Sequence, residues 1–346
     1  MWRYPDGDLG VGCPLPGLIV GFGVTLVLTQ EGRVQAVDQY TGAPLWREDL
    51  RRLLVGAVFL PERQVLVCTA DGDALILNAV RGGVLQRHSL GMTVASTPAV
   101  VGDRLYAMAC DGEGWVVAAF SVDGGSCRAL WRTVLAGPED TRRATAPVAA
   151  TGTHVVVADH RGAVCCLSAD TGQIAHTEEV SPPAPVFAAP VIALDSIYIA
   201  ARNGRCTRLD LATGKPTGWA MTEVEAPVYN SLAIVGGRAY VTTHSGFVCE
   251  FDAQTGGESA ATEVPRCPGW NSGLTSGVAT RDYVFFGAST GHVYAFHRAS
   301  SWPIMMAKMD SAVVGPPAIS DGSVFVATQQ GFVYALCEWR LGNGGS

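Results

Sequence analysis

The sequence carries few charged side chains. Asp, Glu, Lys and Arg make up 16% of its 346 residues, against roughly 25% in an average soluble protein. Long solvated helices need more charge than this. The hydrophobic share of 48% can build a large core and excludes a disordered chain. Glycine and proline, with 41 and 19 residues, mark many turns, so the composition predicts numerous short strands joined by turns.

The sequence also lacks the basic surface of a nucleic-acid-binding protein. Its net charge is −7 at pH 7. Its arginine pairs, Arg51–Arg52 and Arg142–Arg143, are short and isolated. Because phosphate binding needs a continuous basic field, we expect no nucleic-acid partner.

Signals for membrane insertion or secretion are missing as well. Residues 9–30 carry no charge and are long enough to cross a bilayer. However, Pro14, Pro16 and the turn at Gly21–Gly23 favour two strands there. The first residues, Met1–Asp6, contain a proline and no basic cluster before an apolar run. We therefore expect no signal peptide and no membrane contact.

Cysteine patterns that indicate disulfides or zinc are absent. The ten cysteines include no C-x-x-C and no Cys/His ligand spacing. Cys68, Cys206 and Cys249 lie within apolar strand patterns, where a free thiol packs as a small hydrophobic group. The neighbours Cys165 and Cys166 should point to opposite faces of a strand. Without a signal peptide, this cysteine usage predicts a reducing compartment, and we expect a cytoplasmic protein.

What the sequence does contain is an internal repeat. An apolar strand, a turn glycine, an alternating strand, a Thr-Gly turn and a strand with Trp first occur over residues 24–47 and then recur. The first turn recurs at Gly32, Gly72, Gly112 or Gly114, Gly162, Gly204, Gly246, Gly291 and Gly331. The second recurs at Gly42, Gly82, Gly125, Gly172, Gly214 and Gly256, and is eroded to Ser300–Ser301 in the seventh unit.

Each unit holds four predicted strands in about 40 to 49 residues, which is the size of a propeller blade. The eighth unit, residues 313–337, contains only three. The missing outer strand stands at the other end of the chain, where Met1–Tyr4 matches Leu45–Glu48. We predict an all-β, eight-bladed propeller of four-stranded blades, closed by its N-terminal strand. It should form a single domain over residues 1–341, followed by a flexible tail at 342–346, and should be a monomer.

The unit Ala36–Trp46, Ala-Val-Asp-x-x-Thr-Gly-x-x-x-Trp, resembles the repeat of pyrroloquinoline-quinone (PQQ) propellers. That class includes quinoprotein alcohol dehydrogenases and a non-catalytic outer-membrane assembly lipoprotein. The resemblance covers essentially the whole chain and is specific for the propeller class, not for quinone binding.

A closer likeness is to the C-terminal propeller of the beta-alanine-activating enzyme, acyl-CoA synthetase family member four. It rests on Trp2–Tyr4, Gly12–Pro14 and Val34–Gly42, which occur in the same order and at similar spacing. That enzyme carries adenylation and carrier domains ahead of its propeller. The present sequence contains neither, so the resemblance implies a propeller without acyl-activating chemistry.

A quinone-dependent dehydrogenase needs a carboxylate base and oxygen ligands for Ca²⁺ at the mouth of its channel. These groups should lie on or next to the innermost strands. The expected innermost strands contain no Asp or Glu and cover residues 94–98, 143–147, 186–190, 228–232, 273–277 and 313–317. We therefore expect no cofactor, PQQ included, and no metal.

Polar side chains gather in loops that should share one face of the ring. In a propeller, the loops that connect blades lie on the same face as the turns between second and third strands. Arginines there would suit an anionic partner, and Trp270 could anchor a protein. The candidate binding residues are Arg142, Arg143, His160, Arg202, Asn203, Asn230, His244, Arg266, Trp270 and Asn271. The alternative interpretation is ordinary polar decoration of loops.

The sequence thus predicts a binding or scaffolding propeller without catalytic residues. Its expected partner is a protein or a carrier domain, and the resemblance implies an accessory domain of a beta-alanine or acyl-activating enzyme. Two alternatives stay open. One is a quinone-dependent oxidoreductase, and the other is a stand-alone propeller enzyme that acts on a small molecule.

Overall fold

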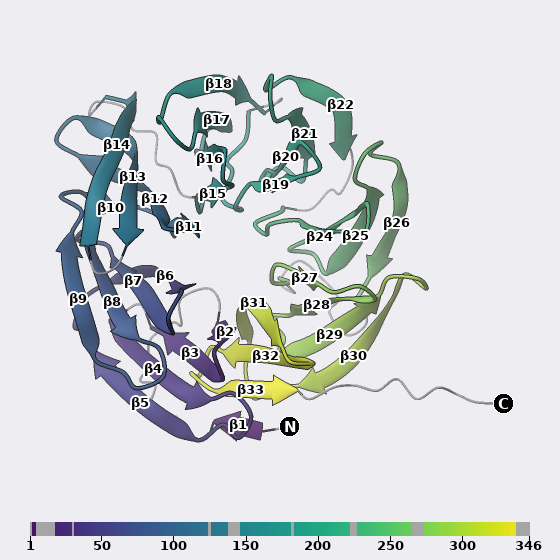
Figure 1. Cartoon of the computed structure of the whole chain (residues 1–346). Coiled ribbons are helices and arrows are strands. Elements are labelled where there is room, and N and C mark those ends of the chain that lie inside the picture. The colour runs from purple at the N-terminus through teal and green to yellow at the C-terminus, as the bar shows by residue number, and fades with distance from the viewer. Residues whose placement is uncertain are drawn as a thin grey trace.

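The computed structural model describes residues 2–4, 18–29, 31–123, 126–137, 146–180, 183–221, 227–264 and 273–336. These residues form eight antiparallel sheets arranged around a central axis, as Figure 1 shows. We number the sheets as blades 1 to 8 along the chain. The described ranges contain no helix with the length and hydrophobicity of a membrane span. The expected tail at 342–346 lies outside them.

Blade 1 consists of β2 (Ile19–Gly21), β3 (Val24–Leu28), β4 (Arg33–Asp38) and β5 (Pro44–Asp49). Blade 2 consists of β6 (Leu54–Leu60), β7 (Gln64–Thr69), β8 (Asp73–Asn78) and β9 (Val84–Ser89). Blade 3 has a divided inner strand and consists of β10 (Thr93–Val94), β11 (Ala99–Val101), β12 (Arg104–Asp111), β13 (Gly114–Asp123) and β14 (Ser126–Ala136). Blade 4 consists of β15 (Ala149–Ala150), β16 (His154–Ala158), β17 (Ala163–Ser168) and β18 (Ile174–Glu179).

Blade 5 consists of β19 (Val191–Ala193), β20 (Ser196–Ala200), β21 (Cys206–Asp210) and β22 (Pro216–Met221). Blade 6 consists of β23 (Ala233–Val235), β24 (Arg238–Thr242), β25 (Phe247–Asp252) and β26 (Glu258–Glu263). Blade 7 consists of β27 (Val278–Ala279), β28 (Tyr283–Gly287), β29 (His292–His297) and β30 (Trp302–Lys308). Blade 8 consists of β31 (Val313–Ser320), β32 (Ser323–Thr328), β33 (Val333–Leu336) and β1 (Trp2–Tyr4).

The N-terminal strand closes the ring. β1 pairs antiparallel with β33, with Trp2 opposite Ala335 and Tyr4 opposite Val333. Figure 1 shows the purple β1 beside the yellow β33. The Tyr4 side chain is buried in a cluster that also contains Val27 of blade 1. This confirms the predicted closure, which joins the two ends of the chain and removes an open seam.

The turn glycines confirm the repeat and explain it. All eight adopt positive φ, between +81° and +123°, and in the third unit the residue is Gly114. At Gly72 an added Cβ would lie 2.0 Å from the Met92 carbonyl oxygen. The Leu90 N–H donates to the Gly72 carbonyl oxygen over 2.7 Å. Glycine is therefore required because the chain that enters the next blade lies directly against this turn.

The innermost strands begin later than predicted. In blades 4 to 7 they are strands of two or three residues that start just after the expected stretches. The reason lies in the hydrogen bonds of the preceding segments. The Val186 N–H donates to the Asp159 carbonyl of blade 4, and the Pro185 carbonyl accepts from Arg202 of blade 5. These segments bond to two neighbouring blades instead of extending one ladder, so an apolar pattern alone misplaces the strand.

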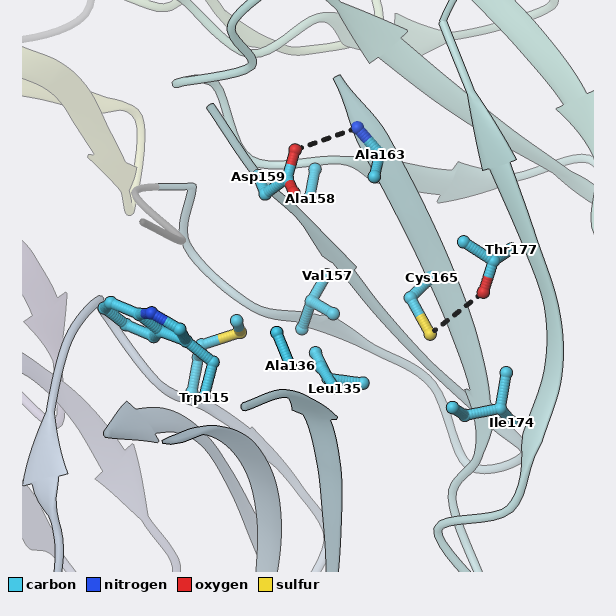
Figure 2. Close-up of a pocket in the computed structure, with 11 residues that line it drawn as sticks. Trp115, Leu135, Ala136, Val157, Ala158, Asp159, Ala163, Cys165, Ile174 and Thr177 are labelled. Atoms are coloured by element: carbon cyan, nitrogen blue, oxygen red, sulfur yellow. Dashed lines mark hydrogen bonds between the residues drawn. The ribbon is translucent and has the colours of Figure 1, made fainter. Parts of the chain in front are cut away.

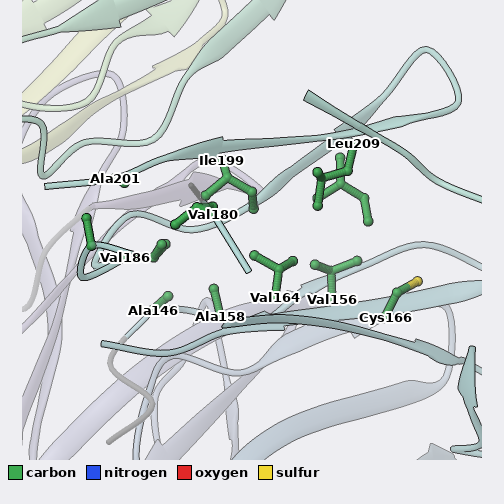
Figure 3. Close-up of a cluster of buried hydrophobic side chains, with 12 residues drawn as sticks. Ala146, Val156, Ala158, Val164, Cys166, Val180, Val186, Ile199, Ala201 and Leu209 are labelled. Carbon is green, nitrogen blue, oxygen red and sulfur yellow. The ribbon is translucent and has the colours of Figure 1, made fainter. Parts of the chain in front are cut away.

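Hydrophobic clusters fill the space between neighbouring blades. Figure 3 shows the cluster between blades 4 and 5, where Val156 and Val164 face Ile199 and Leu209. Burying each such side chain stabilises the fold by about 1.5–3 kcal/mol. Because each sheet has a neighbour on both faces, almost every central-strand residue is buried, which accounts for the low charge of the chain.

Cys165 and Cys166 confirm that the two faces of one strand are buried in different places. Cys165 packs in the cluster between blades 3 and 4. Cys166 packs in the cluster between blades 4 and 5. Neighbouring thiols on a strand therefore point apart, as the alternation predicts.

The recurring Trp and the recurring Thr-Gly turn meet across blade boundaries. The Trp46 indole N–H of blade 1 donates to the Ala79 carbonyl of blade 2 over 3.0 Å. A Cβ at Gly82 would lie 2.9 Å from the Trp46 ring. Trp131 of blade 3 makes the same bond to Ala169 of blade 4 over 2.9 Å. In this contact, the ring of one blade packs on a turn glycine of the next blade, and its N–H donates to a backbone carbonyl near that glycine. We call it the interblade lock.

Candidate protein-binding face

The sequence-predicted binding residues divide into two groups. Five of them lie outside the described residues: Arg142, Arg143, Arg266, Trp270 and Asn271. The other five lie in blades 4 to 6 at the turns and blade-entering segments of one face: His160, Arg202, Asn203, Asn230 and His244. The structure therefore places these five on one face, as predicted.

Two of these residues meet around an aromatic side chain that the sequence analysis missed. The Arg202 Nε–H donates to the Tyr229 hydroxyl over 3.2 Å. The His244 ring lies edge-on to Tyr229, with 5.6 Å between centroids. The Phe187 ring is tilted against the Tyr229 ring, with 5.9 Å between centroids. We call Phe187, Arg202, Tyr229 and His244 the aromatic cluster.

Backbone hydrogen bonds fix the aromatic cluster in place. Arg202 occupies the turn between β20 and β21, and its N–H donates to the Pro185 carbonyl. His244 occupies the turn between β24 and β25, and its N–H donates to the Pro227 carbonyl over 3.0 Å. Phe187 and Tyr229 each follow one of these prolines by two residues. The cluster is therefore held by two adjacent blades.

The aromatic cluster combines exposed ring surface with a cation. Arg202 and His244 are exposed, and Tyr229 is 39% exposed. Exposed Tyr and Arg side chains on a rigid support are typical of the residues that dominate protein interfaces. Arg202 also retains guanidinium N–H groups beyond the Nε donor, which can bind a carboxylate. Chemically, the cluster can bind a partner that offers apolar or aromatic surface next to an anionic group.

The side chains of Asn203 and Asn230 form hydrogen bonds within the protein. The Asn203 side-chain oxygen accepts from the Arg205 N–H over 3.1 Å and closes its turn. The Asn230 amide donates to the Thr242 hydroxyl over 3.1 Å and to the Leu274 carbonyl. It thereby ties blade 6 to the segment that enters blade 7. These two amides are already used within the protein.

His160 lies half-buried in the turn between β16 and β17. The Asp159 carboxylate caps this turn, since it accepts from the N–H groups of Arg161 and Ala163 over 2.8 and 2.9 Å. His160 therefore lies on the same face as the aromatic cluster, in the turn of blade 4 that corresponds to the turns of Arg202 and His244 in blades 5 and 6.

A small apolar cavity between blades 3 and 4 also escaped the sequence analysis. It measures about 90 Å³ and is lined by Trp115, Leu135 and Val157, among others, as Figure 2 shows. The Cys165 thiol faces it and accepts from the Thr177 hydroxyl over 3.7 Å. Burial raises the pKa of this thiol, which makes it a poor nucleophile. No sequence pattern marks the cavity because its walls come from two blades.

Metal ligands are not gathered in the described ranges. There, no group of three or more His, Cys, Asp or Glu side chains lies close enough together to hold a metal ion.

Comparison with known proteins identifies the relatives of this propeller. Residues 30–262 match the family model described as outer membrane protein assembly factor BamB. A protein of that name from Moranella endobia is 24% identical over 331 residues, which cover 90% of this chain and 82% of the relative. Another from Shewanella oneidensis is 24% identical and covers 95% and 86%. The crystal structure of BamB from Moraxella catarrhalis superposes with a TM-score of 0.73 at 17% identity, covering 92% and 95%, and so shows the shared fold.

These matches support the PQQ-like propeller class and leave three finer expectations without support. They give no support to kinship with the beta-alanine-activating enzyme or to a carrier domain as partner. The expected absence of membrane association gains no support from them either.

The expected cytoplasmic location is wrong. The relatives matched along most of this chain are outer membrane protein assembly factors. The error has a physical cause in the cysteines. Cys68, Cys165, Cys166, Cys206 and Cys249 are free thiols buried in the core, and burial raises the pKa of Cys68 to about 12. Thiols that are packed away from oxidants stay reduced in any compartment, so their number does not indicate where a protein resides.

Proposed function

The chain belongs to the outer membrane protein assembly factor BamB family, and from this premise we propose that it is a protein-binding scaffold in outer membrane protein assembly. The aromatic cluster of Phe187, Arg202, Tyr229 and His244 is its proposed contact with a protein partner. The propeller holds this cluster at a fixed position on one face of the ring.

The main support for the proposal is the exposed but fixed Tyr229 ring of the aromatic cluster, together with the family match. The match extends over residues 30–262 and so includes all four cluster residues. Tyr229 is exposed on the outside but is contacted by Phe187, Arg202 and His244 along its sides. Such a preorganised ring loses little conformational freedom when a partner covers it. This favours recognition of a folded or extended protein surface.

Complementation tests the proposal. A strain of the source organism that lacks the gene receives the native chain or the double variant Arg202→Ala/Tyr229→Ala. The readout is the amount of folded outer membrane β-barrel protein, measured from its heat-modifiable mobility in gels. We expect the native chain to restore assembly and the double variant to fail, with unchanged circular dichroism and thermal midpoint.

A matched control separates the aromatic cluster from general loss of charge. Arg87 lies on the outer strand of blade 2 and has an exposed side chain, so Arg87→Ala should complement fully. If the double variant complements as well as the native chain, the aromatic cluster is not the contact. If assembly is normal without the gene, the proposed process is wrong.

The carrier-domain partner and the oxidoreductase alternative each have a direct test. A titration with an isolated acyl carrier protein tests the carrier-domain partner, and saturable binding that Arg202→Ala abolishes would support it. An absorbance titration with PQQ and Ca²⁺ tests the oxidoreductase. We expect no change at tens of micromolar PQQ, a weak threshold for a cofactor, whereas stoichiometric Ca²⁺-dependent binding would make the dehydrogenase the leading function.

A further inference from the structure

The joint between blades 6 and 7 contains a polar cleft on the face opposite the aromatic cluster. The cleft measures about 450 Å³. It opens where the turns between first and second strands meet the turns between third and fourth strands. Its lining residues are Gly236, Arg238, Tyr240, Glu250, Arg281, Asp282, His297, Arg298 and Ala299.

The cleft lies where the interblade lock is missing. By sequence spacing, Ala260 stands where blade 1 has Trp46, and Ser301 stands where blade 2 has Gly82. Ser301 keeps the left-handed backbone of the glycine that it replaces, with φ of +51°. Its hydroxyl donates to the Glu250 carboxylate over 2.9 Å. A polar network thus takes the place of an indole ring.

Arg298 provides a cation that neutral groups hold in place. Its Nε–H donates to the Tyr240 hydroxyl over 3.1 Å. Its other nitrogens donate to the carbonyls of Val235, Thr280 and Arg281. Among the described residues no carboxylate forms an ion pair with Arg298. Its positive charge therefore stays uncompensated by contact and attracts anions into the cleft.

A second arginine is fixed by a buried carboxylate. Glu250 is only 3% exposed and pairs with the Arg238 Nε over 3.3 Å. The Tyr240 hydroxyl also lies 3.4 Å from the same carboxylate oxygen. Arg238 itself is partly exposed, so its planar guanidinium faces the cleft in a defined orientation. Such a guanidinium binds phosphate or carboxylate oxygens through two parallel hydrogen bonds.

The rim adds one more cation and two hydrogen-bonding groups. Arg281 and Asp282 are exposed and come from the turn between β27 and β28. His297 ends β29, and its Nδ1 contacts the Ser300 hydroxyl over 2.9 Å. Three arginines against two carboxylates favour an anionic ligand. The Asp282 carboxylate can accept a hydrogen bond from a hydroxyl group. Because the His297 Nδ1 accepts from the Ser300 N–H over 3.3 Å, its Nε2 carries a proton and can donate a hydrogen bond to a hydroxyl oxygen.

We propose that this cleft binds a phosphorylated polyol. The arginines bind the phosphate, Asp282 accepts a hydrogen bond from a hydroxyl group, and the His297 Nε2–H donates one to a hydroxyl oxygen. The cleft volume is ample for a ligand of this size and too large for a lone phosphate ion to fill. The same chemistry occurs in a free sugar phosphate and in the glycerophosphate headgroup of a lipid. Neither source depends on the protein-binding role proposed above.

Calorimetric titration of the full chain at low ionic strength tests the site. The probes are glucose 6-phosphate, glycerol 3-phosphate, inorganic phosphate and glucose. We expect saturable binding of the two phosphorylated polyols, weaker binding of inorganic phosphate and none of glucose. Arg281→Ala should weaken polyol phosphate binding by roughly 10-fold or more, the loss typical of one charged hydrogen bond. Arg87→Ala removes the same charge elsewhere and should leave the affinity unchanged.

Vesicles of phosphatidylglycerol and of phosphatidylcholine distinguish the two sources. Binding to phosphatidylglycerol vesicles that Arg281→Ala abolishes assigns the site to a lipid headgroup, and binding of only the soluble probes assigns it to a free sugar phosphate. Absence of saturable binding in both assays overturns the proposal. Equal affinity for inorganic phosphate and glucose 6-phosphate, or an unchanged Arg281→Ala variant, overturns it too. Because Arg281 lies far from the aromatic cluster in sequence and on the other face, these outcomes do not bear on complementation.

Discussion

The joint between blades 1 and 2 and the joint between blades 6 and 7 hold equivalent blades together by different chemistry. In the first, the Trp46 ring covers Gly82 and donates to the Ala79 carbonyl. In the second, Arg298 and Glu250 form a polar network, and a cleft of about 450 Å³ remains. A buried ring closes a joint through contact area, whereas charged groups need partners and leave space between them. The repeated residues thus hold the ring of blades together, and the cleft lies at a joint where those residues are replaced.

The joint between blades 4 and 5 is intermediate. His176 takes the place of the tryptophan and donates its Nε2–H to the Leu211 carbonyl over 2.9 Å. A Cβ at Gly214 would lie 2.3 Å from this ring. The geometry of the lock is therefore kept by a smaller ring, while the joint between blades 6 and 7 gives it up altogether.

Removing the ring from the first joint should have the largest effect on stability. Trp46→Ala deletes a partly buried indole and its hydrogen bond, so we expect a loss of about 3 kcal/mol. Urea denaturation measures this. Trp302→Ala is the matched control, because that ring is 60% exposed and its loss should cost under about 0.5 kcal/mol. Equal losses in both variants would show that the lock adds nothing.

Removing the cation from the polar joint should have the next largest effect. Arg298→Met keeps the length of the side chain but leaves the Tyr240 hydroxyl and the Val235 carbonyl without this donor. We expect a loss of about 2 kcal/mol, as for other hydrogen bonds to charged groups. The same variant should weaken glucose 6-phosphate binding. Unaltered stability would mean that Arg298 does not stabilise the joint between blades 6 and 7.

Substitution of two adjacent glycines distinguishes the effect of steric contact from that of backbone strain at the joint between blades 1 and 2. Gly82 and Gly83 have φ of +77° and +81°. A Cβ meets the Trp46 ring at 2.9 Å from Gly82 but meets nothing within 4 Å from Gly83. Gly83→Ala should cost about 1 kcal/mol from strain alone. Gly82→Ala should cost about 1 kcal/mol more, and thermal unfolding of both variants tests whether the ring accounts for the difference.

The stability of the turn in blade 6 should depend slightly on pH, through the Asp252 carboxylate. The Thr255 N–H and hydroxyl donate to Asp252 and lower the pKa of its carboxyl group. A lowered folded-state pKa adds stability above the unfolded value of about 3.9, and this is lost as the pH falls below it. In the Asp252→Asn variant, the thermal midpoint should change less between pH 5 and about pH 3 than it does in the native chain. Blade 7 has His297 at this position and therefore lacks the carboxylate that the turn of blade 6 uses. An Asp252→Asn variant with the pH profile of the native chain would contradict this role of Asp252.

Much of this fold is visible in the sequence because its turns impose strict local rules. The eight turn glycines all have positive φ, at five of them a Cβ would collide with neighbouring atoms, and Trp2–Tyr4 carries the pattern of an outer strand. The innermost strands were misplaced because their preceding segments bond to neighbouring blades. Arg202 and His244 were found as polar turn residues. Tyr229 was missed, since an aromatic residue within an apolar stretch resembles core until its neighbours are known.

The number of blades, the turns and the closure follow from the amino-acid sequence, because they depend on spacing along the chain and on glycines at positions of positive φ. Which side chains meet between blades follows only from the packing of the folded chain. Arg202 contacts Tyr229 across 27 positions of sequence, and Arg298 contacts Tyr240 across 58 positions. Such contacts arise from the packing of one blade on the next, and no period in the sequence encodes them.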